Sequence, residues 1–216
     1  MKKKILVLLV CLLVCSGRSY GSVYNLSPCE DTYVISTTPN FSYGSSSNLS
    51  VNRYLTGAQY VSYLRFDLRD IPASEAVASA RLFLYANDGA GMGGTDAYFV
   101  SDDTWQETMT YTSRPSVGPA VLGSNATSGP SATGTWQYWD LALTPEMIAN
   151  GLLSIALAAN PPSSSDNRHR FNSSEAKTNH PYLLVETSPV PLPPAAWLLG
   201  SGLVGLIGVR RRLALG

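Results

Sequence analysis

The chain has 216 residues, and its 15 basic and 15 acidic side chains give a formal net charge of zero. The charges are distributed unevenly, because residues 22–189 hold 8 of the Lys and Arg side chains but all 15 of the Asp and Glu side chains. The middle of the chain therefore carries about −7, which argues against a nucleic-acid partner and against polyanion binding driven by bulk charge.

The N-terminal 21 residues are typical of a secretory signal peptide. Three lysines are followed by the apolar run Ile5–Val14, which is too short to span a membrane, and then by the small residues Ser19 and Gly21. This pattern predicts export, with signal-peptidase cleavage before Ser22. Cys15 leaves a lipoprotein anchor as the alternative, although a valine precedes it where such anchors have a small residue.

The body of the chain predicts a succession of short β-strands. The strongest signal is Tyr60–Leu68, in which Leu64, Phe66 and Leu68 alternate with polar neighbours. That period of two residues is typical of a strand with one buried face, which needs a second sheet to cover it. Similar signals occur at 32–35, 49–53, 77–86, 96–101, 135–143, 152–159, 168–172 and 182–187.

Helix signals are nearly absent from the same region. Thr144 and Pro145 mark the start of a single short helix that runs to Asn150. About nine or ten short strands with almost no helix predict an all-β fold, a β-sandwich of the jelly-roll type. We therefore expect three parts: a signal peptide at 1–21, the sandwich at 22–189 and a C-terminal segment at 190–216.

Aromatic residues are the first candidates for ligand contact. In one predicted strand, Trp136 and Tyr138 share a face opposite Trp139, which is the better core candidate. A flat pair of rings on the outer face can act as a sugar platform, although such aromatics often only pair across strands. Trp105, in the Trp-x-Glu motif of a long loop, either stacks on a sugar or fixes the loop.

Arg168, His169 and Arg170 form the one basic cluster in the acidic body. Two guanidinium groups favour recognition of a uronate carboxylate without chemistry. In the alternative of a polysaccharide lyase, His169 is the base that removes a proton, and an acid is needed beside it. A solvated strand face also explains the cluster.

A hydrolase is disfavoured because Asp102 and Asp103 point to opposite faces of an extended segment and no nucleophile motif is present. We therefore expect no catalytic residues and no enzymatic activity.

Several acidic residues offer the hard oxygen ligands that calcium prefers. Glu30, Asp31 and Asp140 are the candidate ligands for a structural Ca²⁺, any one of which could help to hold the ion. The spacing of an EF-hand loop is missing, and no His-Glu-x-x-His or paired Cys-x-x-Cys motif indicates another metal. Apart from calcium we expect no cofactor.

A series of short motifs resembles the DNRLRE domain family. They occur in the order that this family shows: Asp31-Thr-Tyr-Val34, Tyr43-Gly-Ser-Ser46, Ser62–Leu68, Ala80–Tyr85, Trp105–Tyr111 with Arg114-Pro115, and Pro181–Val185. The resemblance spans about residues 30–187. It implies a jelly-roll module similar to carbohydrate-binding modules, of the kind found on secreted bacterial proteins and often beside polysaccharide lyases. The fold is implied more directly than any particular sugar.

The C-terminal segment resembles a PEP-CTERM sorting signal of the VPLPA type. It combines a proline motif, a glycine-spaced apolar stretch and a cluster of arginines; the motif residues are Val190, Pro191, Leu192, Pro193, Arg210, Arg211 and Arg212. An apolar segment of about 18 residues can just span a bilayer, with the arginines on the cytoplasmic side. The resemblance implies a transmembrane sorting helix, recognised and removed by an exosortase after transient anchoring in the inner membrane of a Gram-negative bacterium. An ordinary tail anchor is the alternative.

Together these features predict a secreted, non-catalytic β-sandwich of the cell surface or the extracellular polysaccharide matrix, with carbohydrate binding as its expected activity. Its processing partners are signal peptidase and an exosortase. Two alternatives stay open: a polysaccharide lyase or hydrolase, and a structural protein of the biofilm matrix without a specific ligand.

Overall fold

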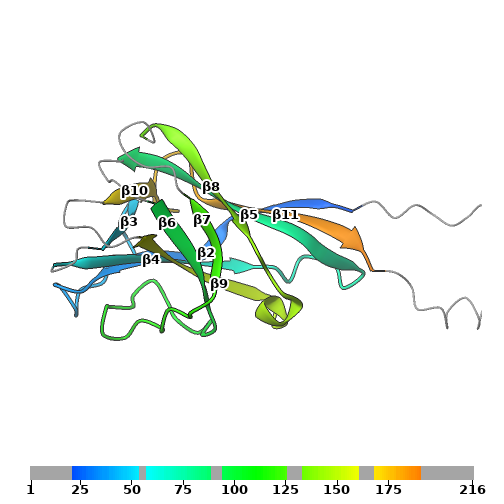
Figure 1. Ribbon diagram of the computed structural model, residues 1–216, viewed down its shortest axis with the longest axis horizontal. Helices are drawn as coiled ribbons and strands as arrows, with labels where there is room; N and C mark the ends of the chain where they lie inside the picture. The colour runs from blue at the N-terminus through cyan, green and yellow to red at the C-terminus, as the bar shows by residue number, and fades with distance from the viewer. Residues whose placement is uncertain (1–20, 54–56, 89–93, 126–132, 161–167, 191–216) are drawn as a thin grey trace, which may run out of the picture.

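Strands dominate the structure, a computed structural model that describes residues 21–53, 57–88, 94–125, 133–160 and 168–190 (Figure 1). The described residues form eleven strands and one short 3₁₀ helix, in chain order β1 (Val23–Leu26), β2 (Pro28–Ile35), β3 (Asn48–Arg53), β4 (Gln59–Asp67), β5 (Glu75–Asp88), β6 (Gly94–Val100), β7 (Val121–Asn125), β8 (Thr135–Leu141), η2 (Pro145–Ile148), β9 (Leu152–Asn160), β10 (His169–Asn172) and β11 (Tyr182–Pro189). The single predicted helix is thus one 3₁₀ turn.

The predicted terminal segments lie almost wholly outside this part of the chain. Only Gly21 of the signal peptide and Val190 of the sorting segment are described, so Pro191–Pro193 and Arg210–Arg212 are not. Within the described ranges, no helix combines the length and the apolar character that a membrane crossing requires.

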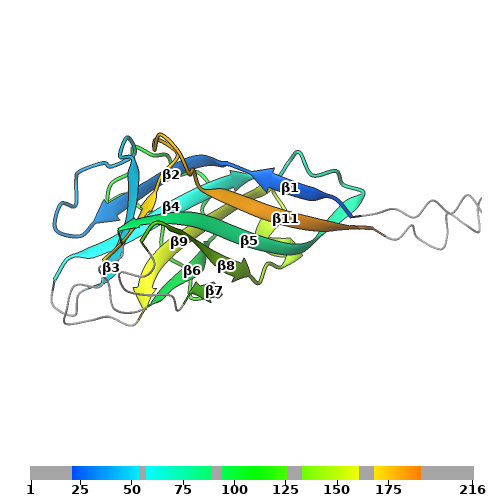
Figure 2. The same cartoon turned by 90° about the horizontal axis from the view of Figure 1, so that it is seen from above.

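Antiparallel pairing arranges the strands as two layers (Figures 1 and 2). In the first layer β5 pairs with β11, β8 and β10, and β11 pairs with β1. In the second layer the order is β2-β4-β9-β6-β7. The strand β3 connects the layers, because Asn48–Val51 is opposite the residues of β10 and Asn52–Arg53 is opposite those of β4. The predicted all-β jelly-roll sandwich is confirmed.

β5 is the strand that organises the outer face of the first layer. Along one edge it pairs with β11 over Glu75–Phe83 and then with β10 over Ala86–Asp88. Along the other edge it pairs with β8 over Ala80–Ala86. A residue near the middle of β5 therefore has direct neighbours on two other strands, which is the basis of the site described below.

The space between the layers is filled by apolar side chains that alternate along each strand. Leu82 and Leu84 of β5, Phe66 of β4 and Trp139 of β8 are buried. The indole Nε1 of Trp139 donates a hydrogen bond to the backbone carbonyl of Thr95 at 2.9 Å. This satisfies the one polar group of the ring, and the prediction that Trp139 belongs to the core is confirmed.

β4 differs from the expected strand with one buried face. Tyr63 is fully buried on its other face, because the loop of residues 101–120 covers the outside of the second layer. The Tyr63 hydroxyl donates to the backbone carbonyl of Pro115 at 3.1 Å, and burial raises the pKa of Tyr63 to about 12. The alternation of residue types located this strand, but it carries no sign that a distant loop packs on top of it.

Candidate functional site

Five side chains form a continuous surface on the outer face of the first layer, which we call the aromatic surface: Phe83, Tyr85, Trp136, Tyr138 and Tyr182. Phe83 on β5 lies directly opposite Tyr182 on β11 and Tyr138 on β8. The rings of Phe83 and Tyr182 are stacked, with centroids 4.7 Å apart and 11° between their planes. The Trp136 ring meets those of Tyr85 and Tyr182 edge to face, with centroids at 5.5 Å and 5.3 Å. The rings thus extend across three neighbouring strands.

The two aromatic residues of β8 keep a large part of their rings in solvent. Trp136 is 39% exposed and Tyr138 is 50% exposed. They alternate with the buried Gln137 and Trp139, so the face predicted for them is confirmed. Pairing across strands holds these rings in place and still leaves ring surface available to a ligand. Their role as ligand contacts stays a prediction.

One end of the aromatic surface is bordered by a charged pair. Arg81 lies opposite Asp140 in the register of β5 and β8, and its Nε is 2.6 Å from the Asp140 Oδ1. The guanidinium carbon of Arg81 is 4.7 Å from the ring centroid of Tyr138, a cation–π contact. Asp140 therefore lies in the first layer, whereas Glu30 and Asp31 lie on β2 of the second. The structure does not bring these three calcium candidates together at one site, and calcium binding by any of them stays a prediction.

The other end of the aromatic surface is bordered by side-chain amides. Asn87 follows Tyr85 by two residues on β5 and donates hydrogen bonds to the side-chain oxygens of Asn48 at 2.6 Å and Asn172 at 2.8 Å. Asn172 in turn donates to the backbone carbonyl of Thr178 at 2.8 Å. The three amides are partly exposed, so they offer donors and acceptors to hydroxyl groups beside the rings.

The predicted basic cluster is divided by the alternation of β10. His169 is 3% exposed, and its ring lies nearly parallel to that of the buried Phe171, with centroids 6.4 Å apart. Arg170 points the other way, with 41% of its side chain exposed and its Nη1 3.8 Å from the Asp88 Oδ2. Arg168 precedes the strand and is partly buried. The prediction that His169 contacts a ligand, as a base or beside the arginines, conflicts with its burial.

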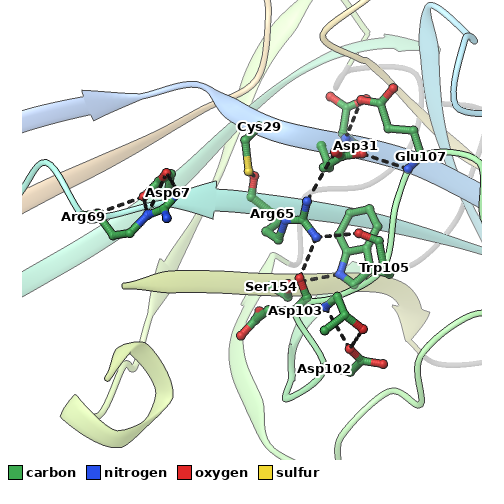
Figure 3. A network of polar contacts seen from close by, with 12 residues as sticks. Cys29, Asp31, Arg65, Asp67, Arg69, Asp102, Asp103, Trp105, Glu107 and Ser154 are labelled. Atoms are coloured by element: carbon green, nitrogen blue, oxygen red, sulfur yellow. Dashed lines mark hydrogen bonds and ion pairs between the residues drawn. The ribbon is translucent and has the colours of Figure 1, made fainter. Parts of the chain in front are cut away.

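Trp105 is also buried, with 5% of its surface exposed, and Figure 3 shows it beside Arg65 under the loop. Its Nε1 donates to the Ser154 hydroxyl at 3.0 Å, and its ring meets that of Tyr63 at 5.9 Å. Arg65 holds the same loop by donating to the backbone carbonyls of Asp103, at 2.6 Å, and of Trp105. A sugar cannot stack on a buried indole, so the geometry supports the loop-fixing interpretation and contradicts Trp105 as a ligand contact.

Asp31 belongs to a cluster of carboxyl groups that the sequence revealed only in part. Oxygen atoms of Asp31, Glu107 and Glu175 lie within 4.8 Å of one another. Burial raises the pKa of Asp31 to about 7 and also raises the pKa of Glu107. Glu30 instead forms an ion pair with Arg65, whose Nη2 is 3.3 Å from the Glu30 Oε1. Glu107 is part of the Trp-x-Glu motif, whereas nothing in the sequence marked Glu175.

A pocket of about 380 Å³ lies at the end of the sandwich beside η2, and its walls include Ile71 and Ile148. Two charged residues on these walls already have partners. Arg69 is paired with a neighbouring aspartate, and Glu75 accepts hydrogen bonds from hydroxyl groups near the start of the domain. The pocket is a weaker candidate than the aromatic surface because none of its lining residues is aromatic, so it offers no ring for a sugar to stack on.

Comparisons with solved structures find similarity at low sequence identity. The CBM22-1–GH10 modules of endo-1,4-β-D-xylanase 10B from Clostridium thermocellum, complexed with xylohexaose, are 10% identical with a TM-score of 0.35. That match covers 81% of this chain and 30% of the xylanase chain. The module CBM6cm-2 of Cellvibrio mixtus lichenase 5A, in complex with cellotriose, is 11% identical with a TM-score of 0.29, and the match covers 77% of this chain and 98% of the module. No curated protein sequence matches this chain.

The sequence itself supports a firmer assignment. The profile of carbohydrate-binding module family 96 matches residues 22–187. This range begins directly after the predicted signal peptide and ends within β11, so it contains nearly the whole sandwich and more than half of the chain. It includes every residue of the aromatic surface and of the carboxyl cluster. The chain belongs to carbohydrate-binding module family 96.

Proposed function

We propose that this protein is a secreted, non-catalytic carbohydrate-binding protein and that it binds polysaccharide on the aromatic surface. Membership of a carbohydrate-binding module family supports the activity. The observation that carries the site is the continuous row of Tyr182, Phe83 and Tyr138 across three strands, with the partly exposed Trp136 beside it.

The chemistry of this surface suits sugars because a pyranose ring has a face of C–H groups that packs on an aromatic ring. Hydroxyl groups at the edge of such a sugar need hydrogen-bond partners, which Arg81 and Asn87 offer at the two borders. The rings lie on the outside of a sheet rather than inside a pocket. An extended polysaccharide chain that lies across the strands is therefore a better ligand than an isolated monosaccharide.

Uronate-containing chains are the glycan class that the local positive charges of Arg168 and Arg170 favour. Arg170 is partly exposed on β10, next to the amide border, and its contact with Asp88 is long at 3.8 Å. A solvent-exposed ion pair of this kind is weak, so a sugar carboxylate can compete for the guanidinium group. Because the body carries about −7, such local contacts by Arg170 and Arg168 must supply the affinity.

A catalytic function has less support from the geometry. The one histidine of the basic cluster, His169, is buried, so it is poorly placed to remove a proton from a polysaccharide. The hydrolase alternative needs two carboxylates on either side of a bond. Asp102 instead accepts hydrogen bonds from the backbone and hydroxyl of Thr104, and Asp103 accepts one from Asn150. These two carboxylates are engaged in fixing the loop.

The terminal motifs support a location outside the cytoplasm. We infer that signal peptidase removes residues 1–21 and that an exosortase recognises Val190–Pro193 together with the apolar stretch and Arg210–Arg212. The protein would then be anchored transiently in the inner membrane of a Gram-negative bacterium and released to the cell surface or the polysaccharide matrix.

A glycan array that includes neutral and uronate-containing polysaccharides tests the proposed activity. We expect binding of at least one polysaccharide class, with longer chains bound more tightly than short oligosaccharides of the same sugar. Absence of binding to every glycan would contradict the proposal and leave a structural role in the matrix as the better explanation.

A further inference from the structure

Three carboxyl groups from distant parts of the chain converge at the edge of the sandwich. Asp31 comes from β2, Glu107 from the loop of residues 101–120 and Glu175 from the turn between β10 and β11. Figure 3 shows the carboxyl groups of Asp31 and Glu107 next to each other. Three acidic groups at this separation repel one another, so the arrangement needs a physical reason.

The carboxyl group of Asp31 provides a second and independent observation. The residue is fully buried, and its Oδ2 accepts a hydrogen bond from the backbone N–H of Ser174 at 2.8 Å. Its Oδ1 is buried as well, and within the described residues it has no hydrogen-bond partner. A buried carboxylate oxygen without a partner is costly, and most such oxygens in proteins bind a donor or a cation. Asp31 thus contributes a buried, unsatisfied carboxylate oxygen beside the carboxyl groups of Glu107 and Glu175.

The guanidinium group of Arg65 is already engaged by partners outside the cluster. Arg65 forms its ion pair with Glu30 and uses Nη1 for the backbone carbonyls of Asp103 and Trp105. A bound cation would supply positive charge to these three carboxyl groups.

The carboxyl groups are held in place by the backbone around them. The Glu107 Oε1 accepts the backbone N–H of Asp31 at 3.2 Å, and the Glu107 carbonyl accepts the Ser42 hydroxyl at 3.0 Å. Gly44 packs so tightly here that a Cβ atom would lie 2.5 Å from the Glu107 carbonyl oxygen. Glu175 is exposed, and its Oε1 accepts the hydroxyl of Ser174 at 2.8 Å. Two of the groups are therefore positioned before any ion binds, and the third is free to adjust.

We propose that Asp31, Glu107 and Glu175 bind a Ca²⁺ ion that ties β2, the loop of residues 101–120 and the turn between β10 and β11 together. All three groups offer carboxylate oxygens, and the cluster contains no His or Cys ligand, which favours calcium over zinc or copper. Calcium holds its oxygen ligands at about 2.3–2.6 Å, so oxygens on opposite sides of the ion lie about 5 Å apart. The separation of up to 4.8 Å in the cluster fits this size.

Thermal unfolding of the full chain in CaCl₂ and in EDTA tests the site without any glycan. A calcium concentration about 100 times the dissociation constant should raise the melting temperature by about 5–10 °C. Tb³⁺, which replaces calcium at oxygen sites, should bind with luminescence excited through nearby aromatic rings, and CaCl₂ should displace it. An identical melting temperature in CaCl₂ and EDTA, or no Tb³⁺ signal that CaCl₂ displaces, would overturn the proposal.

Glu175→Gln is the decisive variant: the side chain is exposed, so we expect its replacement to leave the fold intact. We expect the melting temperature of this variant in EDTA to stay within about 2 °C of the original, because exposed substitutions have small effects. The calcium concentration needed to stabilise the variant should rise at least about tenfold. Glu186→Gln is the matched control, because Glu186 is also exposed and also accepts a serine hydroxyl, from Ser79 at 2.9 Å. Equal calcium responses of the two variants would show a diffuse charge effect and refute the site. Asp31→Asn should abolish the response.

Discussion

The sharpest test of the aromatic surface is Trp136→Ala, which removes the partly exposed indole. A large aromatic side chain can bury about 150–250 Å². Because 39% of Trp136 is exposed, roughly 100 Å² or less remains for a ligand to cover. At about 25 cal/mol per Å², complete coverage contributes about 2.4 kcal/mol and half coverage about 1.2 kcal/mol. Since about 1.4 kcal/mol is a factor of ten, Trp136→Ala should weaken polysaccharide binding by about 8-fold to 60-fold.

The assay is affinity electrophoresis in gels that contain a polysaccharide identified on the array, followed by calorimetry with a defined oligosaccharide. Trp136→Phe keeps a flat ring and should retain most of the affinity. Phe41→Ala is the control, because Phe41 is 61% exposed but lies in the loop between β2 and β3, where its ring contacts Tyr43 and not a ring of the aromatic surface. Melting temperatures of all variants show whether each protein is folded.

Two results would refute the reasoning about the aromatic surface. If Trp136→Ala and Tyr138→Ala both keep the original affinity, the sugar binds elsewhere on the sandwich. If Phe41→Ala weakens binding as much as Trp136→Ala does, the loop between β2 and β3 is part of the site and the magnitude derived from Trp136 alone is wrong.

Three further predictions concern other parts of the chain. Trp105→Ala should leave glycan specificity unchanged but lower the free energy of unfolding, measured by denaturant titration, by about 3–5 kcal/mol, because it removes a buried indole ring. An unchanged free energy of unfolding would show that the loop of residues 101–120 does not depend on this ring. Arg168→Ala and Arg170→Ala together should weaken binding of uronate chains more than binding of neutral chains in the electrophoresis assay, and equal losses would exclude carboxylate recognition. Intact-mass measurement on protein from its native host should show the loss of residues 1–21 and of the tail after about Pro193, and a full-length mass would exclude this processing.

The sequence predicted those features of the candidate site that depend only on neighbouring residues within one strand. The alternation of Trp136, Tyr138 and Trp139 follows directly from the period of two residues in a strand, and it assigned the correct face to each ring. It did not predict that Phe83 and Tyr182 complete the surface. That depends on which strands become neighbours, and β5 and β11 are far apart in the chain.

The errors about single side chains come from burial that depends on parts of the chain distant in sequence. Trp105 and Tyr63 are covered because a long loop packs on the second layer. His169 is covered because it lies on the same face of β10 as the buried Phe171. The strand β7 was not among the predicted strands. In the structure, a Cβ atom at Gly123 would lie 2.3 Å from the backbone carbonyl oxygen of Asp140, so the glycine permits a close approach to β8.

The pairing of β1 with β11 determines how the domain responds to mechanical tension. Ser22 and Thr187 are hydrogen-bonded neighbours, so both ends of the described domain emerge side by side (Figure 2). A force that pulls these ends apart breaks the short β1–β11 ladder one hydrogen bond at a time. A force between Val190 and a polysaccharide held on Phe83 instead runs lengthwise along β5 and β11, whose pairing extends from Tyr182 to Pro189. The hydrogen bonds of that ladder share the force and must yield together, so the domain should resist tension far better between ligand and C-terminal end than between its own two ends.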